Sequence, residues 1–357
     1  MASKLNRFYA KFNFRFDSAK RMNFYRKLAS MLRNNFTLMD AMERIYSTES
    51  RGGSTPGEPF AIVIADVQDK LEQGYSFPDA MRDWTPANEV LMLAVGDVSK
   101  LSDALDNVVR VGVGIEKIKK AMSDALLYPS VLLILTFVIV MAVGIYLVPP
   151  LLDAAGTNIV WTGAAAALVG VSEFFNNFWY LILLGLAGLV MLIVLSLSRW
   201  TGAWRVRFDK IPPWSLYKIS VSVGWMMSLA AMVAAGGSLP VSLKLLADHG
   251  NRYLKNILNR TLGYITSGDN LGRALARTGA DFPNEEIVGD LTIYADMNGF
   301  DQNLSQIAND YLDSSVRKME SISSVLNSVG ILLVSLAIAW VVFGTFDMQD
   351  QITAALS

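Results

Sequence analysis

Three long apolar stretches stand out along a chain that is otherwise polar and patterned for helices. They cover residues 126–149, 178–198 and 329–346, and none of them contains Lys, Arg, Asp or Glu. At a rise of 1.5 Å per residue, a helix over the first stretch is more than about 30 Å long, which is enough to cross the hydrocarbon core of a bilayer. The pattern therefore predicts three transmembrane helices.

The basic residues beside these stretches predict on which side of the membrane each polar segment lies. The predicted external loop, residues 150–177, and the C-terminal tail, residues 347–357, contain neither Lys nor Arg. Basic residues gather at the opposite ends of the three stretches: Lys117, Lys119, Lys120, Arg199, Arg205, Arg207, Lys210, Arg317 and Lys318. Because Lys and Arg accumulate in cytoplasmic loops, the N-terminus and both large polar segments are predicted to be cytoplasmic, and the C-terminus external.

The two large polar segments, residues 21–125 and 199–328, each show the apolar periodicity of a bundle of short helices. Their turn and cap residues recur in one order, as the pairs Asn35 and Gly236, Thr37 and Ser238, Gly74 and Gly268, Pro86 and Pro283, and Asp97 and Asp296. Such recurrence predicts an internal repeat. We expect an all-α membrane protein with two tandem cytoplasmic helical bundles, each followed by an outgoing transmembrane helix, and residues 178–198 as the return helix.

Residues 1–20 form a separate basic amphipathic pattern. Apolar side chains recur at helical spacing, at Leu5, Phe8, Tyr9, Phe12 and Phe16, and basic side chains lie between them at Lys4, Arg7, Lys11 and Arg15. One interpretation is a helix that binds anionic lipid or an acidic partner. The other is a helix that packs on the following bundle and keeps its charges in water.

The composition offers little catalytic chemistry. There are no cysteines, the single histidine is His249, and no phosphate-binding loop of the GxxxxGK[ST] type occurs. We interpret His249 as a residue at a helix end, and Asp97 and Asp296 as helix caps, with a divalent-ion site as the alternative for the two acids. The formal net charge of −1 gives no indication of nucleic-acid binding. We predict no catalytic, cofactor-binding or metal-binding residues.

Several short sequence motifs resemble those of a known protein family. They are residues 24–32 (FYRKLASML), Gly236 with Ser238 and Leu239, Tyr128 with Pro129 at the start of the first apolar stretch, Val148 with Pro149 at its end, and Ile211 with Pro212 after the second. Together with the tandem bundles, these strings make residues 22–346 resemble the inner-membrane platform proteins of type IV pilus and type II secretion machines. Asn35 and Thr37 replace a Gly and a Pro that are usual in that family, and residues 96–100 depart from its turn pattern.

The resemblance implies a non-enzymatic, multi-pass protein of the bacterial inner membrane, with a cytoplasmic N-terminus and a periplasmic C-terminus. Its implied partners are a cytoplasmic hexameric assembly ATPase, pilin or pseudopilin subunits, other inner-membrane assembly proteins, the lipid membrane and further copies of itself. The implied role is to couple the ATPase to pilin extraction and fibre assembly, in a pilus of type IVb or plasmid type. Lys4, Arg7, Lys11, Arg15, Lys117, Lys119 and Lys120 are the candidate contacts for motor or lipid.

Three alternatives stay open at this point. The platform of a type II secretion system would assemble a pseudopilus instead of a pilus. A small transporter or channel would need a polar pathway, but the apolar stretches contain no ionisable residue. A membrane-anchored signalling adaptor would also accommodate the two bundles.

Overall fold

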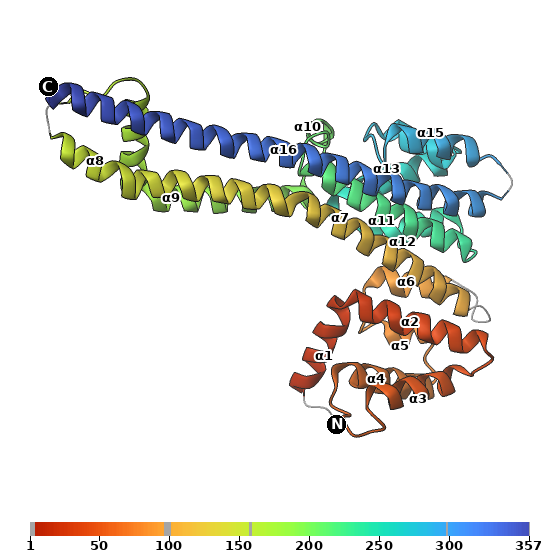
Figure 1. The fold of residues 1–357 in the computed structure, drawn as a ribbon. Coiled ribbons are helices and arrows are strands. Elements are labelled where there is room, and N and C mark those ends of the chain that lie inside the picture. Colours follow the sequence, from red (N-terminus) through yellow and green to blue (C-terminus); the bar gives the residue numbers. More distant parts are fainter. Residues whose placement is uncertain (1–3, 96–100, 157–158, 298, 357) are drawn as a thin grey trace. The chain divides into compact units, whose positions relative to one another are not determined.

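The computed structural model describes residues 4–95, 101–156, 159–297 and 299–356, and every regular element within these ranges is a helix (Figure 1). The chain divides into two compact units. The first unit comprises Met1–Lys120 and Ser198–Val316, and the second comprises Ala121–Leu197 and Arg317–Ser357. Two long helices, α7 and α16, contribute residues to both units.

The first unit contains two sets of helices. The first set is α1 (Lys4–Phe16), α2 (Ser18–Arg33), α3 (Leu38–Glu49), α4 (Pro59–Glu72), α5 (Phe77–Met81), α6 (Ala87–Val95) and the start of α7 (Leu101–Ala142). The second set is α10 (Ala203–Phe208), α11 (Trp214–Ala234), α12 (Leu239–His249), α13 (Arg252–Thr266), α14 (Leu271–Thr278), α15 (Glu285–Tyr294) and the start of α16 (Phe300–Leu356). Helices α2 to α7 therefore correspond in order to helices α11 to α16.

The core of the first set is formed by the apolar sides of its helices. Phe24 and Leu28 of α2 and Ala41, Met42 and Ile45 of α3 are all buried, with at most 4% of each residue exposed. These residues recur at spacings of three and four, so each helix places them on one side. Burial of these sides against one another holds the short helices together.

Corresponding turns in the two sets have the same backbone conformation. Asn35 ends α2 at φ 62°, and Gly236 ends α11 at φ 90°. In both turns the next amide closes back onto the helix, since the Phe36 amide donates to the Met31 carbonyl at 3.2 Å and the Gly237 amide donates to the Met232 carbonyl at 2.9 Å. This is the Schellman arrangement, which favours Gly and tolerates Asn.

The next turn repeats in the same way. Gly74 follows α4 at φ 88°, and Gly268 follows α13 at φ 98°. The N-caps of α3 and α12, which are corresponding helices in the two sets, differ, however. Thr37 Oγ1 accepts the Asp40 amide at 3.1 Å, whereas Ser238 takes the N-cap position of α12 without a side-chain capping bond.

By length and composition alone, four helical stretches in the described part of the chain could cross a membrane, whereas the sequence analysis expects three. They are Leu101–Ala155, Gly163–Arg199, Trp214–Ala234 and Phe300–Ala355. The additional one is α11, whose most apolar window is 72% buried inside the protein, compared with 0–17% for the other three. Helix α11 is therefore buried in the core of the protein, whereas the apolar parts of the other three stretches are mostly not covered by other residues.

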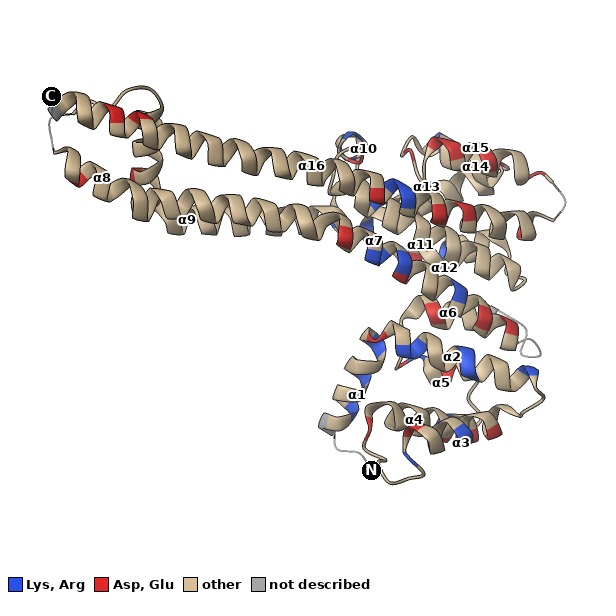
Figure 2. Cartoon of the chain, in the orientation of Figure 1, with Lys and Arg blue, Asp and Glu red and all other residues tan. Residues whose placement is uncertain are grey.

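The second unit consists of the later part of α7, the π-helical segment η2 (Val143–Leu147), α8 (Val148–Ala155), α9 (Gly163–Arg199) and the later part of α16. Figure 2 shows that Lys, Arg, Asp and Glu are absent from long portions of these helices. Residues 150–177, the predicted external loop, are helical at both ends, since α8 extends to Ala155 and α9 begins at Gly163.

Pro149 accounts for the π-helical segment. A proline ring clashes with the carbonyl four residues earlier and donates no amide hydrogen, so the helix before it widens. The Val148 amide bonds to the Val143 carbonyl, five residues back, and the Gly144 carbonyl is left for other donors. Ser172 Oγ of α9 donates to that carbonyl at 2.5 Å, and Asn176 Nδ2 donates to it at 3.3 Å. A polar group in an apolar unit is therefore satisfied by a neighbouring helix.

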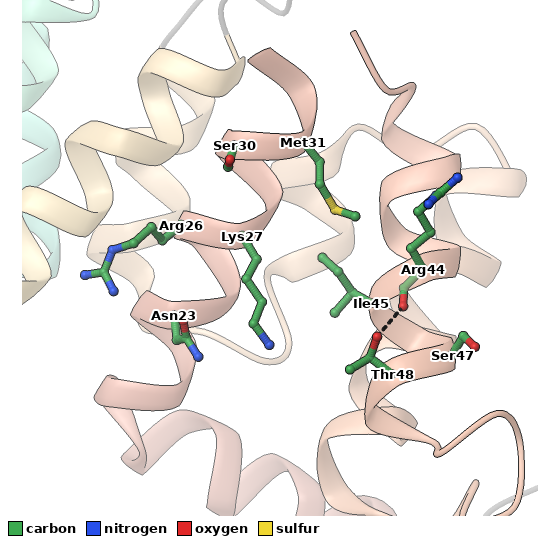
Figure 3. A pocket seen from close by; sticks show the side chains of 9 residues that line it. All are labelled: Asn23, Arg26, Lys27, Ser30, Met31, Arg44, Ile45, Ser47 and Thr48. Carbon is green, nitrogen blue, oxygen red and sulfur yellow. Dashed lines mark hydrogen bonds between the residues drawn. The ribbon is translucent and has the colours of Figure 1, made fainter. Parts of the chain in front are cut away.

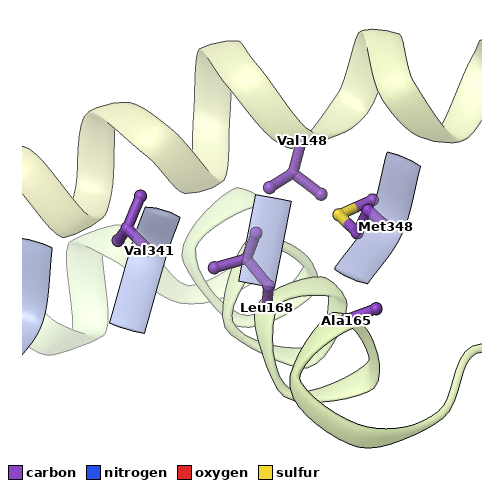
Figure 4. Close-up of a cluster of buried hydrophobic side chains, with 5 residues drawn as sticks. All are labelled: Val148, Ala165, Leu168, Val341 and Met348. Carbon is purple, nitrogen blue, oxygen red and sulfur yellow. The ribbon is translucent and has the colours of Figure 1, made fainter. Parts of the chain in front are cut away.

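A small apolar cluster joins α8, α9 and α16 (Figure 4). Its buried members are Val148, Ala165, Leu168, Val341 and Met348. Beside it, Asp347 of α16 accepts the Ala165 amide in the first turn of α9 at 2.9 Å, and Gln351 exchanges two 3.2 Å bonds with the backbone of Thr162. An acidic side chain at a helix N-terminus satisfies amides that have no partner within the helix.

Candidate interaction surfaces

Helix α1 packs on α4 through a side that the sequence analysis did not single out. Ala10 and Phe14 are buried, and the Phe14 ring lies 5.0 Å from the Phe60 ring, centroid to centroid. Arg7 Nη2 lies 2.8 Å from Asp66 Oδ1 on α4. The predicted apolar row instead points outward, since Phe8 and Phe12 are 70% and 56% exposed.

A buried charge network fixes the end of α1. Arg21 Nη1 donates to the Phe14 and Arg15 carbonyls at 2.7 and 2.9 Å, so this guanidinium caps the last turn of α1. Its Nη2 and Nε atoms donate to the Glu89 carboxylate of α6 at 2.7 to 3.1 Å. Tyr25 donates to the same carboxylate at 3.1 Å, and burial raises the pKa of the Tyr25 hydroxyl well above its usual value. Three helices are thus tied through one buried pair.

Several predicted contact residues are engaged within the chain. Arg7 pairs with Asp66, and Lys117 Nζ lies 2.6 Å from Asp313 Oδ1 of α16. Arg15 and Lys119 line one groove, so the structure brings these two cations to the same place. Lys120 is exposed and lies outside that groove, and the side chain of Lys4 lies outside the described residues.

Lys11 lies at the edge of a second charged network. Lys70 Nζ lies 2.9 Å from Asp83 Oδ2 and 3.4 Å from Asp66 Oδ2. The pKa of Asp83 is lowered, first by its hydrogen bond with Lys70 and to a smaller extent by the charges of Lys11 and Arg7. Arg7 and Lys11 therefore lie near acids of the first set of helices, whereas Arg15 is exposed.

A groove with a volume of about 710 Å³ lies between α2 and α3 (Figure 3). Met31 and Ile45 lie across from one another, and Lys27 points into the space between the helices. Arg26 and Arg44 lie at its rims; in Figure 3 the Arg26 side chain points away from α3, and the Arg44 guanidinium lies 4.7 Å from the Phe36 ring centroid. The complete lining is Asn23, Arg26, Lys27, Ser30, Met31, Arg44, Ile45, Ser47 and Thr48. Apolar side chains between cations suit a partner helix that carries apolar and acidic residues.

The second set contains a buried pair that sequence reasoning missed. The sequence pattern predicts Arg205 as a cytoplasmic basic residue, yet its side chain is 1% exposed and its Nε lies 3.1 Å from Asp209 Oδ1. Tyr253 donates to Asp209 Oδ2 at 3.0 Å, and the Arg205 guanidinium lies 4.9 Å from the Tyr253 ring centroid. Burial raises the pKa of Asp209, which the Arg205 charge opposes. The i, i+4 spacing of Arg205 and Asp209 was the available signal.

His249 and Asp296, two of the three remaining candidates for chemistry, are hydrogen-bonded within the second set, and Asp296 binds residues of α14 and its N-cap instead of capping a helix itself. His249 ends α12 with Nδ1 at 3.0 Å from the Leu245 carbonyl. Asp296 Oδ2 accepts from Arg273 Nη2 and Asn270 Nδ2, both at 3.0 Å. Asp97 lies outside the described residues, and among the described ones no three His, Asp or Glu side chains are grouped so as to hold a metal ion.

The family-motif residues have structural positions of different kinds. Tyr128 is 48% exposed on α7, and Pro129 lies inside that helix. Pro149 follows the π-helical segment, and Pro212 precedes Pro213, the N-cap of α11. Of the four, Pro149 has the clearest local effect, through the carbonyl of Gly144.

Comparison with known proteins gives the chain a family. Residues 24–149 and 225–346 each match the sequence model described as "Type II secretion system (T2SS), protein F". The chain is 24% identical over 325 residues to the type IV pilus assembly protein PilC of Myxococcus xanthus, an alignment that covers 86% of this chain and 74% of that protein. It is 23% identical over 334 residues to the PilC of Pseudomonas aeruginosa, covering 88% and 86%. The chain belongs to the type II secretion system protein F family.

Proposed function

We propose that this protein is the inner-membrane platform of a type IV pilus machine and couples a cytoplasmic hexameric ATPase to pilin extraction. The observation that carries the proposal is the double family match, in which each matched segment holds a set of short helices followed by a long helix with an apolar end. The likeness to two proteins named for type IV pilus assembly favours a pilus over a secretion pseudopilus. The chain itself takes no catalytic part in this role.

The proposed topology has three spans, with both bundles in the cytoplasm and the C-terminus in the periplasm. Helix α11 is assigned to the second bundle, because most of its apolar window is buried and it corresponds in order to α2. Since the chain has no native cysteine, single cysteines at exposed positions can be tested with a membrane-impermeant thiol reagent. Labelling of intact cells at residue 354, without labelling at Ser54, is the expected result.

The proposed motor contact is the groove between α2 and α3. Arg7 and Lys117 have carboxylate partners within the chain, whereas Arg26 and Arg44 lie at the rims of an open groove. An acidic helix of the motor would place its carboxylates between these rims. Long α7 and α16 would then carry a movement of the bundles towards the apolar segments, where pilin is bound.

The test is co-purification from detergent-solubilised membranes, with a tag at the N-terminus. We expect the ATPase and a pilin to accompany the wild-type protein, and Arg26→Glu/Arg44→Glu to lose the ATPase while keeping the pilin. The matched control is Arg252→Glu/Arg260→Glu, which makes the same charge change on exposed residues of α13. Equal loss of the ATPase in both variants would reject the groove, and capture of neither partner by the wild-type protein would reject the platform.

A further inference from the structure

Helix α1 exposes an unusually aromatic face. Phe8, Tyr9, Phe12 and Phe16 are 70%, 59%, 56% and 72% exposed, and the Phe12 and Phe16 rings pack together at 4.6 Å between centroids. Aromatic rings are among the side chains that gain most from leaving water. A contiguous exposed patch of this kind marks a surface that is covered by something else.

The face is held outward by the structure. Ala10 and Phe14 are buried on the opposite side of α1, and Arg21 binds the last carbonyls of the helix. Arg7 adds an ion pair to Asp66. Because these anchors occupy the inner side, the aromatic rings cannot turn into the bundle without detaching the helix.

Cations flank the aromatic row. Lys11 and Arg15 are four residues apart, so they form a row along the helix beside the row of Phe8, Phe12 and Phe16. Arg15 is exposed and Lys11 is half-buried. Aromatic rings with a basic edge are the composition of helices that lie in the headgroup region of anionic membranes.

The face also lies beside the chain segment that leads to the first apolar stretch. Arg15 and Phe16 line a groove together with Ile115 and Lys119 of α7. Lys119 precedes the apolar stretch that starts at residue 126 by about seven residues, or roughly 10 Å of helix. The headgroup region adds roughly 5–8 Å on each side of the hydrocarbon core, so Lys119 lies only a short way along its helix from it.

We propose that the aromatic face of α1 binds the surface of the membrane, with its rings at the boundary of the acyl chains and Arg15 on anionic lipid headgroups. The helix then fixes the first bundle against the inner leaflet. This binding is independent of the motor coupling proposed above, and α1 precedes both segments that match the family.

The experiment uses the full-length chain in lipid nanodiscs. A nitroxide is attached at Phe12→Cys, or at Asn6→Cys on the neighbouring polar side of the same helix; both positions are exposed and the chain has no other cysteine. Collision rates with oxygen, which enriches in lipid, and with a water-soluble nickel complex then report the surroundings of each label. The discs contain either phosphatidylcholine alone or a mixture with phosphatidylglycerol.

In the anionic discs, we expect the oxygen-to-nickel collision ratio to be several-fold higher at position 12 than at position 6. In Arg15→Glu, and in phosphatidylcholine alone, the ratio at position 12 should fall towards that at position 6. Equal ratios at the two positions in anionic discs would overturn the proposal. So would protection of position 12 that needs added ATPase, or spin–spin broadening that shows a second copy of α1 on this face.

Discussion

Replacing Arg21 by Met tests whether the buried charge network holds the first bundle together. Arg21 and Glu89 are 3% and 6% exposed, and their closest contact is 2.7 Å. Removal of one partner leaves the other charge buried without compensation, which costs about 3–5 kcal/mol. Arg21 also binds the Phe14 and Arg15 carbonyls, so the loss should reach α1 as well as α2 and α6.

Hydrogen exchange measured by mass spectrometry on the protein in nanodiscs gives the local opening free energy of each helix. About 1.4 kcal/mol of opening free energy corresponds to a tenfold change in the opening equilibrium, and thus in the exchange rate. The amides of α1, α2 and α6 should therefore exchange roughly a hundred- to several-thousand-fold faster in Arg21→Met. Exchange in α12 to α15 should stay as in the wild type. A whole-protein melting temperature would be less informative, because a chain of two units need not unfold in one step.

Two further variants separate the network from a general effect of mutation. Lys20→Met removes a neighbouring cation whose ion pair with Asp17 is exposed, and it should change exchange little. Arg21→Met/Glu89→Leu removes both charges and should recover much of the protection, because an apolar pair is often as stable as a buried ion pair. Less than a tenfold change in Arg21→Met, or a double variant no better than the single one, would refute the reasoning.

Three other substitutions test local geometry. Asn35→Ala loses the local hydrogen bonding by which Asn tolerates the left-handed conformation at φ 62° and should lower the exchange protection of α2 and α3 by about 1 kcal/mol, whereas Asn35→Gly should not; equal protection in both variants would contradict the turn. Gly272→Ala puts a Cβ 2.2 Å from the Thr292 amide nitrogen, so α14 and α15 should lose exchange protection, by about 1–3 kcal/mol. Ser172→Ala removes the 2.5 Å bond to the Gly144 carbonyl and should lower the exchange protection of η2 and the start of α9 by about 1 kcal/mol; unchanged protection there would show that Asn176 suffices.

The sequence indicated helices and turn positions where the chemistry is local. An apolar row, a following Gly or Asn and a Thr cap depend on residues within one or two turns, so Asn35 and Gly74 could be located from the sequence alone. The first and last residues of the helices could be predicted less well from the sequence. Residues 150–177 are predicted to form a loop because they lack a long apolar run, yet α9 begins at residue 163. The Ala, Val and Ser residues at the start of α9 are compatible with a helix but do not mark where it begins.

Burial could not be predicted from apolar character. Helix α11 meets the length and hydropathy of a span, and only its covered surface distinguishes it from α9. In α1 the opposite error arises, because the buried side consists of Ala10 and Phe14 and the stronger aromatic row is exposed. Which side of an amphipathic helix packs inward depends on the surface that receives it, here the acids and the Phe60 ring of α4.

The same reasoning explains why a list of cations is a poor guide to a partner surface. Lys117 looks available in the sequence, but its carboxylate partner, Asp313, lies 196 residues later. Arg205 looks like one of the basic residues that mark the cytoplasmic side of the membrane, but it is buried beside Asp209 and Tyr253 and is not on the surface. A basic side chain can attract a partner protein or lipid only if no carboxylate of its own chain already neutralises its charge. In the first bundle, the rims of the α2–α3 groove and Arg15 of α1 meet this condition best, so the two proposals place different partners on different surfaces of one bundle.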